Sequence, residues 1–238
     1  MIGTVINFAA VIVGSLLGNL LGSRLPEKLR QTVIAGLGLF TLVLGIQMFL
    51  STKNALIVLG SVLIGAMLGE WWQIENRLES LGAWLEKKFA RGKTGGQGQE
   101  NFIKGFLTAS LVFCIGPVAI LGSIQDGLTG NFDLLAVKST LDGFASLAFA
   151  STLGLGVGFA ALPVLVYQGG LTLLARQLQP LMSDRMIAEM TATGGVMLVG
   201  IAISGLLELK KIRVGNFLPA LVIAPVLVAL LSWWGILR

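Results

Sequence analysis

The sequence predicts an all-α protein, a polytopic transmembrane helical bundle of about eight spans. Of its 238 residues, 55% are hydrophobic and only 12% are charged, whereas about a quarter of the residues in soluble domains are charged. The mean hydropathy is +0.86, and apolar runs of about 20 residues recur, enough to cross about 30 Å of hydrocarbon as helices. Because these runs lack a two-residue alternation, they favour helices over a closed barrel.

Eight candidate spans follow from the apolar runs. They cover residues 2–22, 32–50, 54–73, 102–123, 134–154, 157–177, 187–208 and 215–236. Met1 leads into the first run with no basic region and no small-residue cleavage site, so we expect that run to remain as a span. Basic residues gather in the first, third and seventh loops, which predicts a cytoplasmic location for these loops and an outside location for both termini.

The segment 74–91 differs from the spans because charged residues interrupt it throughout. Its apolar residues, including Leu78, Leu81 and Leu85, recur at spacings of three and four, which is typical of an amphipathic helix. We expect this helix to lie in the membrane interface. Residues 92–98 are rich in glycine and polar residues, and they predict a flexible linker.

The order of these segments indicates a single membrane domain over residues 1–238. It divides into a first three-span unit (1–73), the interfacial helix and linker (74–100), a central helix pair (101–154) and a second three-span unit (155–238). Five crossings separate corresponding spans of the two three-span units, so these units would run in opposite directions, as in an inverted repeat. Apolar composition also creates similarity between spans by chance, so the two units are either an inverted repeat or a chance likeness.

The first span carries a stripe of glycines, Gly14, Gly18 and Gly22, at four-residue spacing. Such a stripe lets another helix approach closely. The partner is either a helix of the same chain or, as we expect for a homodimer, a helix of a second copy.

The fourth span is interrupted by Gly116 and Pro117. Proline removes a backbone donor and clashes with the preceding turn, and glycine adds freedom beside it. The pair predicts either a kink or a broken helix whose freed backbone groups line a cavity. Ser123, which follows the break, favours the second reading.

The fifth span has a polar face formed by Lys138, Ser139, Asp142 and Ser146. Lys138 and Asp142 are four residues apart and so lie on one helical face. A neutralising pair makes burial of the two charges tolerable. The face is either an ion pair near the outer surface or a substrate or coupling-ion site.

Asp126 and Asp133 fall in the loop before the fifth span, where we expect them to be solvated.

The composition argues against several classes of function. The chain has no histidine and one cysteine, Cys114, which argues against zinc sites and metal clusters. No nucleotide-binding or catalytic motif is visible, so we expect no enzyme activity and no cofactor. The basic loops are a topology signal, and no nucleic-acid partner is expected.

Four motifs occur together in this chain. They are CIGP at 114–117, GSIQDGL at 122–128, KSTLDG at 138–143 and NFLPAL at 216–221. With the glycine-rich first span, the chain resembles the YqgA-like or YdfK-like family of uncharacterised bacterial inner-membrane proteins, a domain-of-unknown-function family. The resemblance covers the whole chain. It implies a multi-pass protein of the bacterial cytoplasmic membrane and supplies no substrate or catalytic residues.

These observations predict a secondary transporter or channel-like carrier of a small polar or charged solute. In this hypothesis Lys138 attracts an anionic group or balances Asp142, Asp142 binds a cation or proton, serines donate hydrogen bonds, and the helix break exposes backbone groups. The candidate site comprises Gly116, Pro117, Ser123, Lys138, Ser139, Asp142 and Ser146. The alternative is a membrane scaffold or regulator that transports nothing, in which the polar cluster holds helices together and residues 74–91 bind a partner or membrane lipid.

Overall fold

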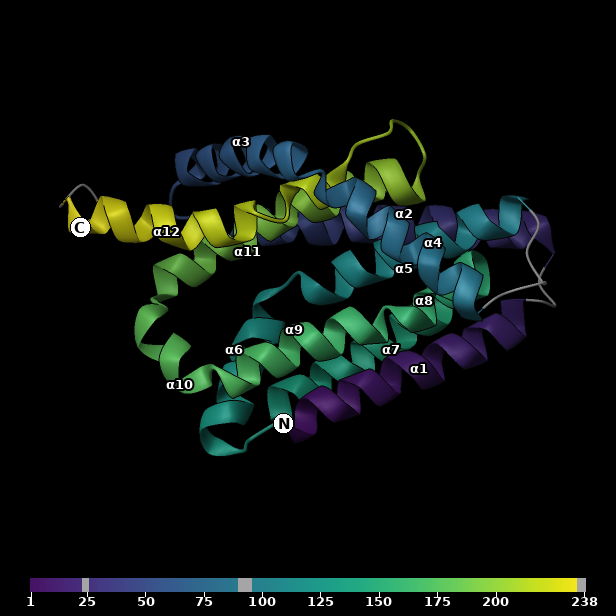
Figure 1. The fold of residues 1–238 in the computed structure, drawn as a ribbon, viewed down its shortest axis with the longest axis horizontal. Coiled ribbons are helices and arrows are strands. Elements are labelled where there is room, and N and C mark those ends of the chain that lie inside the picture. The colour runs from purple at the N-terminus through teal and green to yellow at the C-terminus, as the bar shows by residue number, and fades with distance from the viewer. Residues whose placement is uncertain (23–25, 90–95, 235–238) are drawn as a thin grey trace. The chain divides into compact units, whose positions relative to one another are not determined.

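The structure is a computed structural model that describes residues 1–22, 26–89 and 96–234. Every regular element in these ranges is helical (Figure 1), which confirms the all-α class. The elements are α1 (Ile2–Gly22), α2 (Glu27–Phe49), α3 (Ala55–Trp72), α4 (Ile74–Phe89), α5 (Gly96–Cys114), α6 (Pro117–Thr129), α7 (Asp133–Leu153), α8 (Gly156–Phe159), α9 (Ala161–Leu173), α10 (Ala175–Leu178), η1 (Gln179–Leu181), α11 (Asp184–Ile201), η2 (Ala202–Leu206), η3 (Val214–Phe217) and α12 (Ala220–Trp233).

The predicted count of about eight spans is not confirmed. Among the described residues, six helical segments are long and apolar enough to cross a membrane, or seven if the bent pair α5 and α6 crosses as one span. At 21 residues α7 is long enough, but it does not belong to this set because Lys138, Asp142 and several hydroxyl-bearing residues make it less apolar.

The polarity of the helices is that of a membrane protein. On α1 the buried residues are mostly small or polar: Gly3, Thr4, Asn7, Val11, Gly14, Ser15 and Gly18. Large apolar side chains of the same helix point outward, including Val5 (58% exposed), Val13 (55%) and Leu20 (66%). A helix on the surface of a soluble protein has the opposite pattern. The chain is therefore an integral membrane protein, and the exposed apolar face of α1 is the face suited to lipid.

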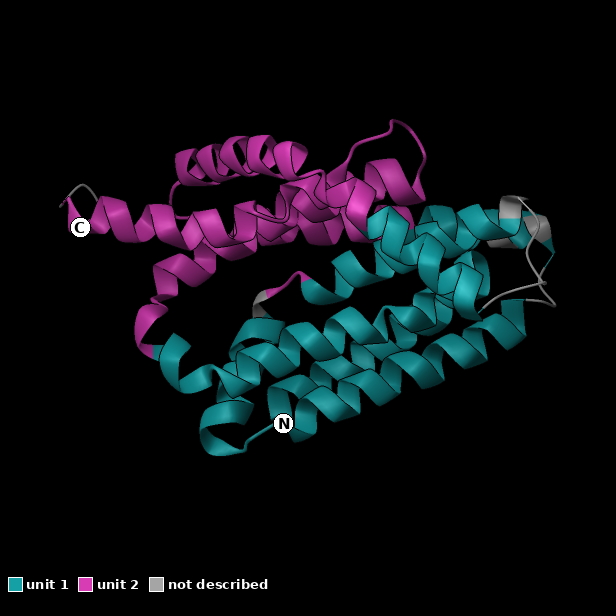
Figure 2. Ribbon diagram, in the orientation of Figure 1, with its two compact units in different colours: residues 1–37, 78–114, 118–179 teal, residues 38–77, 115–117, 180–238 magenta. Residues whose placement is uncertain are grey.

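The helices form two compact units (Figure 2). Unit 1 comprises residues 1–37, 78–114 and 118–179, and unit 2 comprises residues 38–77, 115–117 and 180–238. These units group residues by spatial contact, so the predicted division of the sequence and the inverted repeat remain predictions.

In unit 1, α1 packs along the length of α7, and α9 lies against α1. The glycine stripe of α1 allows its close contact with α7. A Cβ atom added at Gly14 would meet the carbonyl oxygen of Gly143, and one at Gly18 would meet that of Leu147. Gly22 faces Ser151 in the same way. The stripe therefore packs within the chain and α7 covers it, while the homodimer remains a prediction.

Unit 2 is built on α3, α11 and α12, with the greater part of α2. Glu189, a fully buried residue of α11, holds the segment that precedes α3. The Glu189 carboxylate accepts hydrogen bonds from the hydroxyl of Thr52 (2.6 Å) and from the backbone N–H groups of Lys53 and Asn54 (2.8 Å each). Because both oxygens are satisfied and the positive end of α3 lies beside them, this buried charge has a structural role.

The motif at 216–221 also has a structural explanation in unit 2. Asn216 is 3% exposed; its amide nitrogen donates to Oε2 of Glu70 (2.6 Å), and its side-chain oxygen accepts from the N–H of Glu75 (2.8 Å). The side chain thus fixes the junction between α3 and α4.

The predicted amphipathic helix at 74–91 is present as α4. Leu85 is buried against Phe102 and Phe106 in unit 1, whereas Trp84 and Phe89 are exposed. The predicted linker lies partly outside the described residues.

Candidate functional site

The centre of unit 1 holds a buried polar cluster contributed by α1, α7 and α9. Lys138 and Asp142 of α7 form a buried ion pair, with the Lys138 ammonium donating to Oδ2 of Asp142. Nδ2 of Asn7 on α1 donates to the same carboxylate oxygen at 2.9 Å. The Asn7 amide also donates to Oε1 of Gln168 on α9 at 3.2 Å. One amide thus links three helices around the charge pair.

Burial is nearly complete across this cluster. Asn7 and Gln168 are fully buried, while Lys138 and Asp142 retain 7% and 8% exposure. A pair of charges removed from water is stable only with close geometry and additional hydrogen bonds, and Asn7 supplies one of these. The predicted ion pair is therefore present, and it lies in the interior of the unit.

Several polar atoms of this region have no hydrogen-bond partner among the described residues. They are Oδ1 of Asn7, Nε2 of Gln168 and the hydroxyls of Ser123 and Ser146. A buried polar group without a partner costs about 1–3 kcal/mol, and such groups in native proteins commonly bind water or a ligand. Asn7 donates to Asp142, Gln168 accepts from Asn7, and Ser146 follows Asp142 by one helical turn. These three residues leave one acceptor, one amide donor and one hydroxyl available beside two charges.

The other predicted site residues occupy different environments. The Ser139 hydroxyl donates to the carbonyl of Leu135 at 2.6 Å, so it is available only as an acceptor. Ser123 lies in α6, fully buried, and makes no hydrogen bond to the pair. Gly116 and Pro117 are grouped with unit 2, separately from the pair in unit 1.

The predicted break at Gly116 and Pro117 is present, while its role in lining a cavity stays a prediction. α5 ends at Cys114, α6 begins at Pro117, and the two helices are bent by 61°. Gly116 has a φ of +151°, a conformation that side chains strongly disfavour.

Gly116→Ala is expected to lower the free energy of unfolding by about 1–3 kcal/mol, because the new Cβ is incompatible with this backbone conformation. Gly170→Ala in α9 is the matched control. Both glycines have open space around the added atom, but Gly170 is helical, so alanine there is expected to be neutral or stabilising. Chemical denaturation in detergent micelles measures both. Equal stability of the two variants would contradict a glycine requirement at the break.

The prediction that Asp126 is solvated is wrong. α6 continues to Thr129 and places Asp126 against the first turn of α1, with 3% exposure. Its carboxylate accepts from the N–H of Gly3 at 3.1 Å and pairs with the amino group of Met1 at 3.0 Å. The unpaired N–H groups at the start of a helix attract a carboxylate. Asp133, in contrast, is exposed at the start of α7, in agreement with its prediction.

A second polar contact extends the cluster between α1 and α9. The hydroxyls of Thr4 and Thr172 lie 3.4 Å apart, and Thr172 donates to the carbonyl of Gln168 at 2.8 Å. No group of three or more His, Cys, Asp or Glu side chains that could hold a metal ion lies within the described ranges. The chemistry of this cluster is that of hydrogen bonding and charge pairing.

Asn7 and Gln168 were missed in the sequence analysis, although the sequence contains a signal for both. Thr4, Asn7, Val11, Gly14 and Gly18 recur at alternating spacings of three and four, so Asn7 belongs to the same helix face as the glycines. A strongly polar side chain on the packing face of an apolar span is itself a functional signal. Gln168, in the apolar sixth predicted span, follows the same rule.

Comparison with known proteins gives the family. The profile of the family described as "Protein of unknown function (DUF554)" matches residues 2–229. "Uncharacterized protein YqgA" of Escherichia coli (strain K12) is 33% identical over 238 residues, which cover 99% of this chain and 100% of that protein. "Uncharacterized membrane protein YdfK" of Bacillus subtilis (strain 168) is 30% identical over 240 residues, 99% of each. No solved structure matches the chain. The chain thus belongs to the DUF554 family, as its four motifs and glycine-rich first span predict.

Proposed function

We propose that this protein is a secondary transporter or channel-like carrier of a small polar or charged solute in the bacterial cytoplasmic membrane. The observation that carries the proposal is the Lys138–Asp142 pair, buried in a lipid-facing unit beside polar atoms that have no partner. Ionisable groups inside a membrane protein are costly, and they commonly mark substrate or ion pathways. α-Helical spans with basic residues in short loops fit the cytoplasmic membrane.

In this proposal the solute completes the hydrogen bonds that the chain leaves open. Oδ1 of Asn7 accepts from the solute and Nε2 of Gln168 donates to it. The Ser146 hydroxyl does either. Asp142 exchanges its partner between Lys138 and a cation or proton, which would couple the charge of the pair to the occupancy of the site. These groups also exclude apolar solutes, because an apolar molecule would leave them unsatisfied.

Ser146→Ala separates a binding role from a structural one. Within the described residues the hydroxyl has no partner, so its removal is expected to leave stability unchanged or to raise it. If the hydroxyl binds the solute, transport is expected to fall about tenfold, the effect of one lost hydrogen bond. Ser151→Ala is the matched control, because Ser151 lies in the same helix and its hydroxyl donates to the carbonyl of Ala148 at 2.8 Å.

The measurement uses the full chain in proteoliposomes. Light scattering after a rapid gradient of potassium chloride, sodium phosphate, glycine or urea reports flux of each probe. We expect the wild-type protein to move at least one probe faster than protein-free vesicles, and Ser151→Ala to match it. If no probe moves faster than in protein-free vesicles, the scaffold or regulatory function is favoured. Unchanged flux in Ser146→Ala would remove Ser146 from the site.

A further inference from the structure

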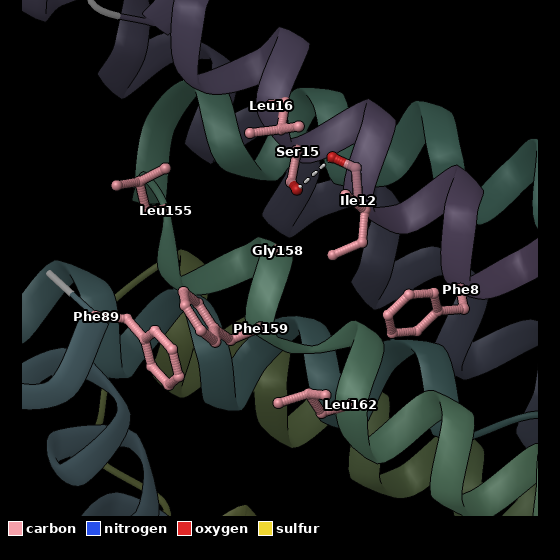
Figure 3. A pocket seen from close by; sticks show the side chains of 9 residues that line it. All are labelled: Phe8, Ile12, Ser15, Leu16, Phe89, Leu155, Gly158, Phe159 and Leu162. Carbon is pink, nitrogen blue, oxygen red and sulfur yellow. Dashed lines mark hydrogen bonds between the residues drawn. The ribbon is translucent and has the colours of Figure 1, made fainter.

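Unit 1 also contains an apolar cavity of about 360 Å³, separate in chemistry from the polar cluster. Figure 3 shows side chains from α1, α4, α8 and α9 around it, including Phe8, Ile12, Leu16 and Leu162. The one hydroxyl in the lining belongs to Ser15, and it donates to the carbonyl of Ile12 at 2.9 Å. The cavity therefore offers contacts suited to a hydrocarbon chain and little to a polar solute.

The cavity lies at a level of α1 where the acyl chains of membrane lipids are close by. α1 is an apolar span of 21 residues, which at about 1.5 Å per residue crosses the hydrocarbon core. The residues of α1 that line the cavity lie between Phe8 and Leu16, in the middle of that span. Acyl chains of the bilayer are therefore the medium beside the cavity.

A positive charge lies beside one residue of the cavity lining. The Phe89 ring lines the cavity and packs against Phe159, with ring centroids 5.4 Å apart. The ammonium of Lys88 lies 5.5 Å from the centroid of the Phe89 ring and 4.8 Å from that of Trp84. Trp84, Lys88 and Phe89 are all exposed at the end of α4. Lysine and tryptophan side chains extend from apolar surroundings toward the headgroup level of a membrane.

We infer that unit 1 binds one anionic phospholipid, with an acyl chain in this cavity and the phosphate paired with Lys88. Charge complementarity selects the headgroup, and the apolar lining holds the chain. The ring faces of Trp84 and Phe89 hold the ammonium in place through cation–π contacts. Such a lipid would join α1, α4 and α9, the helices around the cavity.

Native mass spectrometry of the full chain in detergent tests this assignment, with phosphatidylglycerol and phosphatidylcholine of identical chains as probes. We expect one tightly held phosphatidylglycerol per chain. Lys88→Gln is expected to weaken it about fivefold, the effect of one lysine near an anionic lipid surface. Lys28→Gln, at another exposed lysine of unit 1, is the control and is expected to bind as the wild type does.

A second variant tests the cavity. Leu162 is 43% exposed at the cavity, so Leu162→Trp fills the space without replacing a fully buried side chain, and it is expected to abolish the retained lipid. Equal binding of the two lipids, unchanged by Lys88→Gln, would overturn the headgroup assignment. Retention of phosphatidylglycerol by a folded Leu162→Trp protein would overturn the cavity as its seat.

Discussion

Substitution of Gly18 by valine is expected to lower the free energy of unfolding by about 3 kcal/mol, or to prevent folding. Even a Cβ atom at this position meets the backbone carbonyl of Leu147, and a backbone, unlike a flexible side chain, has no alternative rotamer. Overpacking of a rigid interface forces the two helices apart and so separates contacts along their length. Thermal unfolding in detergent, followed by tryptophan fluorescence, measures the loss.

The control for Gly18→Val is Gly36→Val in α2. Gly36 is also a helical glycine, but a Cβ atom there would have open space around it. Both variants share the intrinsic helix preference of valine, so the difference between them isolates the contact of α1 with α7. A Gly18→Val protein as stable as Gly36→Val would show that this face of α1 is not packed against α7.

Replacement of Lys138 alone by glutamine is expected to destabilise the protein by about 3–5 kcal/mol, because it leaves the buried Asp142 carboxylate without its counter-charge. Asp142→Asn, which leaves Lys138 unpaired, is expected to have a similar effect. The double variant Lys138→Gln with Asp142→Asn removes both charges and keeps an amide oxygen at position 142 for Asn7. It is expected to be near the wild type in stability, because a neutral pair has no buried charge to compensate.

The double variant also separates folding from transport. We expect it to fold and to lose flux in the proteoliposome assay, since the exchange of partners at Asp142 requires charge. Asp133→Asn, an exposed acid at the start of the same helix, controls for the loss of negative charge and is expected to retain both properties. Single variants as stable as the double variant would contradict a buried pair, and full flux in the double variant would contradict the proposed role of Asp142.

The sequence predicted the helices well because apolar length and proline or glycine breaks are local signals. α7, α4 and the break at Gly116 lie within a few residues of their predicted positions. The number of crossings was less predictable. It depends on whether α5 and α6 cross together and on how far a helix with two internal charges is tolerated in lipid, and neither is a property of one segment alone.

The candidate site was predicted in part. Lys138 and Asp142 share one helix, so their four-residue spacing was enough to pair them. Asn7, 135 positions before Asp142, donates to its carboxylate from α1, and Gln168, 26 positions after Asp142, accepts from Asn7 on α9. Only the packing of α1 and α9 against the rest of unit 1 brings them there. Asp126 was misplaced for the same reason, because its partner is the start of α1.

In the proposed carrier, the glycine contacts of α1 restrict which helix can give access to Asp142. Rocking of α1 away from α7 would break backbone contacts at Gly14, Gly18 and Gly22 together, so these two helices are expected to move as one rigid body. In the described part of the chain, the polar links from α1 to α9 are an amide contact of 3.2 Å and a hydroxyl pair 3.4 Å apart. Opening on the α9 side therefore requires the smaller rearrangement, and it would carry Gln168 away from Asn7 while Lys138, Asp142 and Asn7 stay in place.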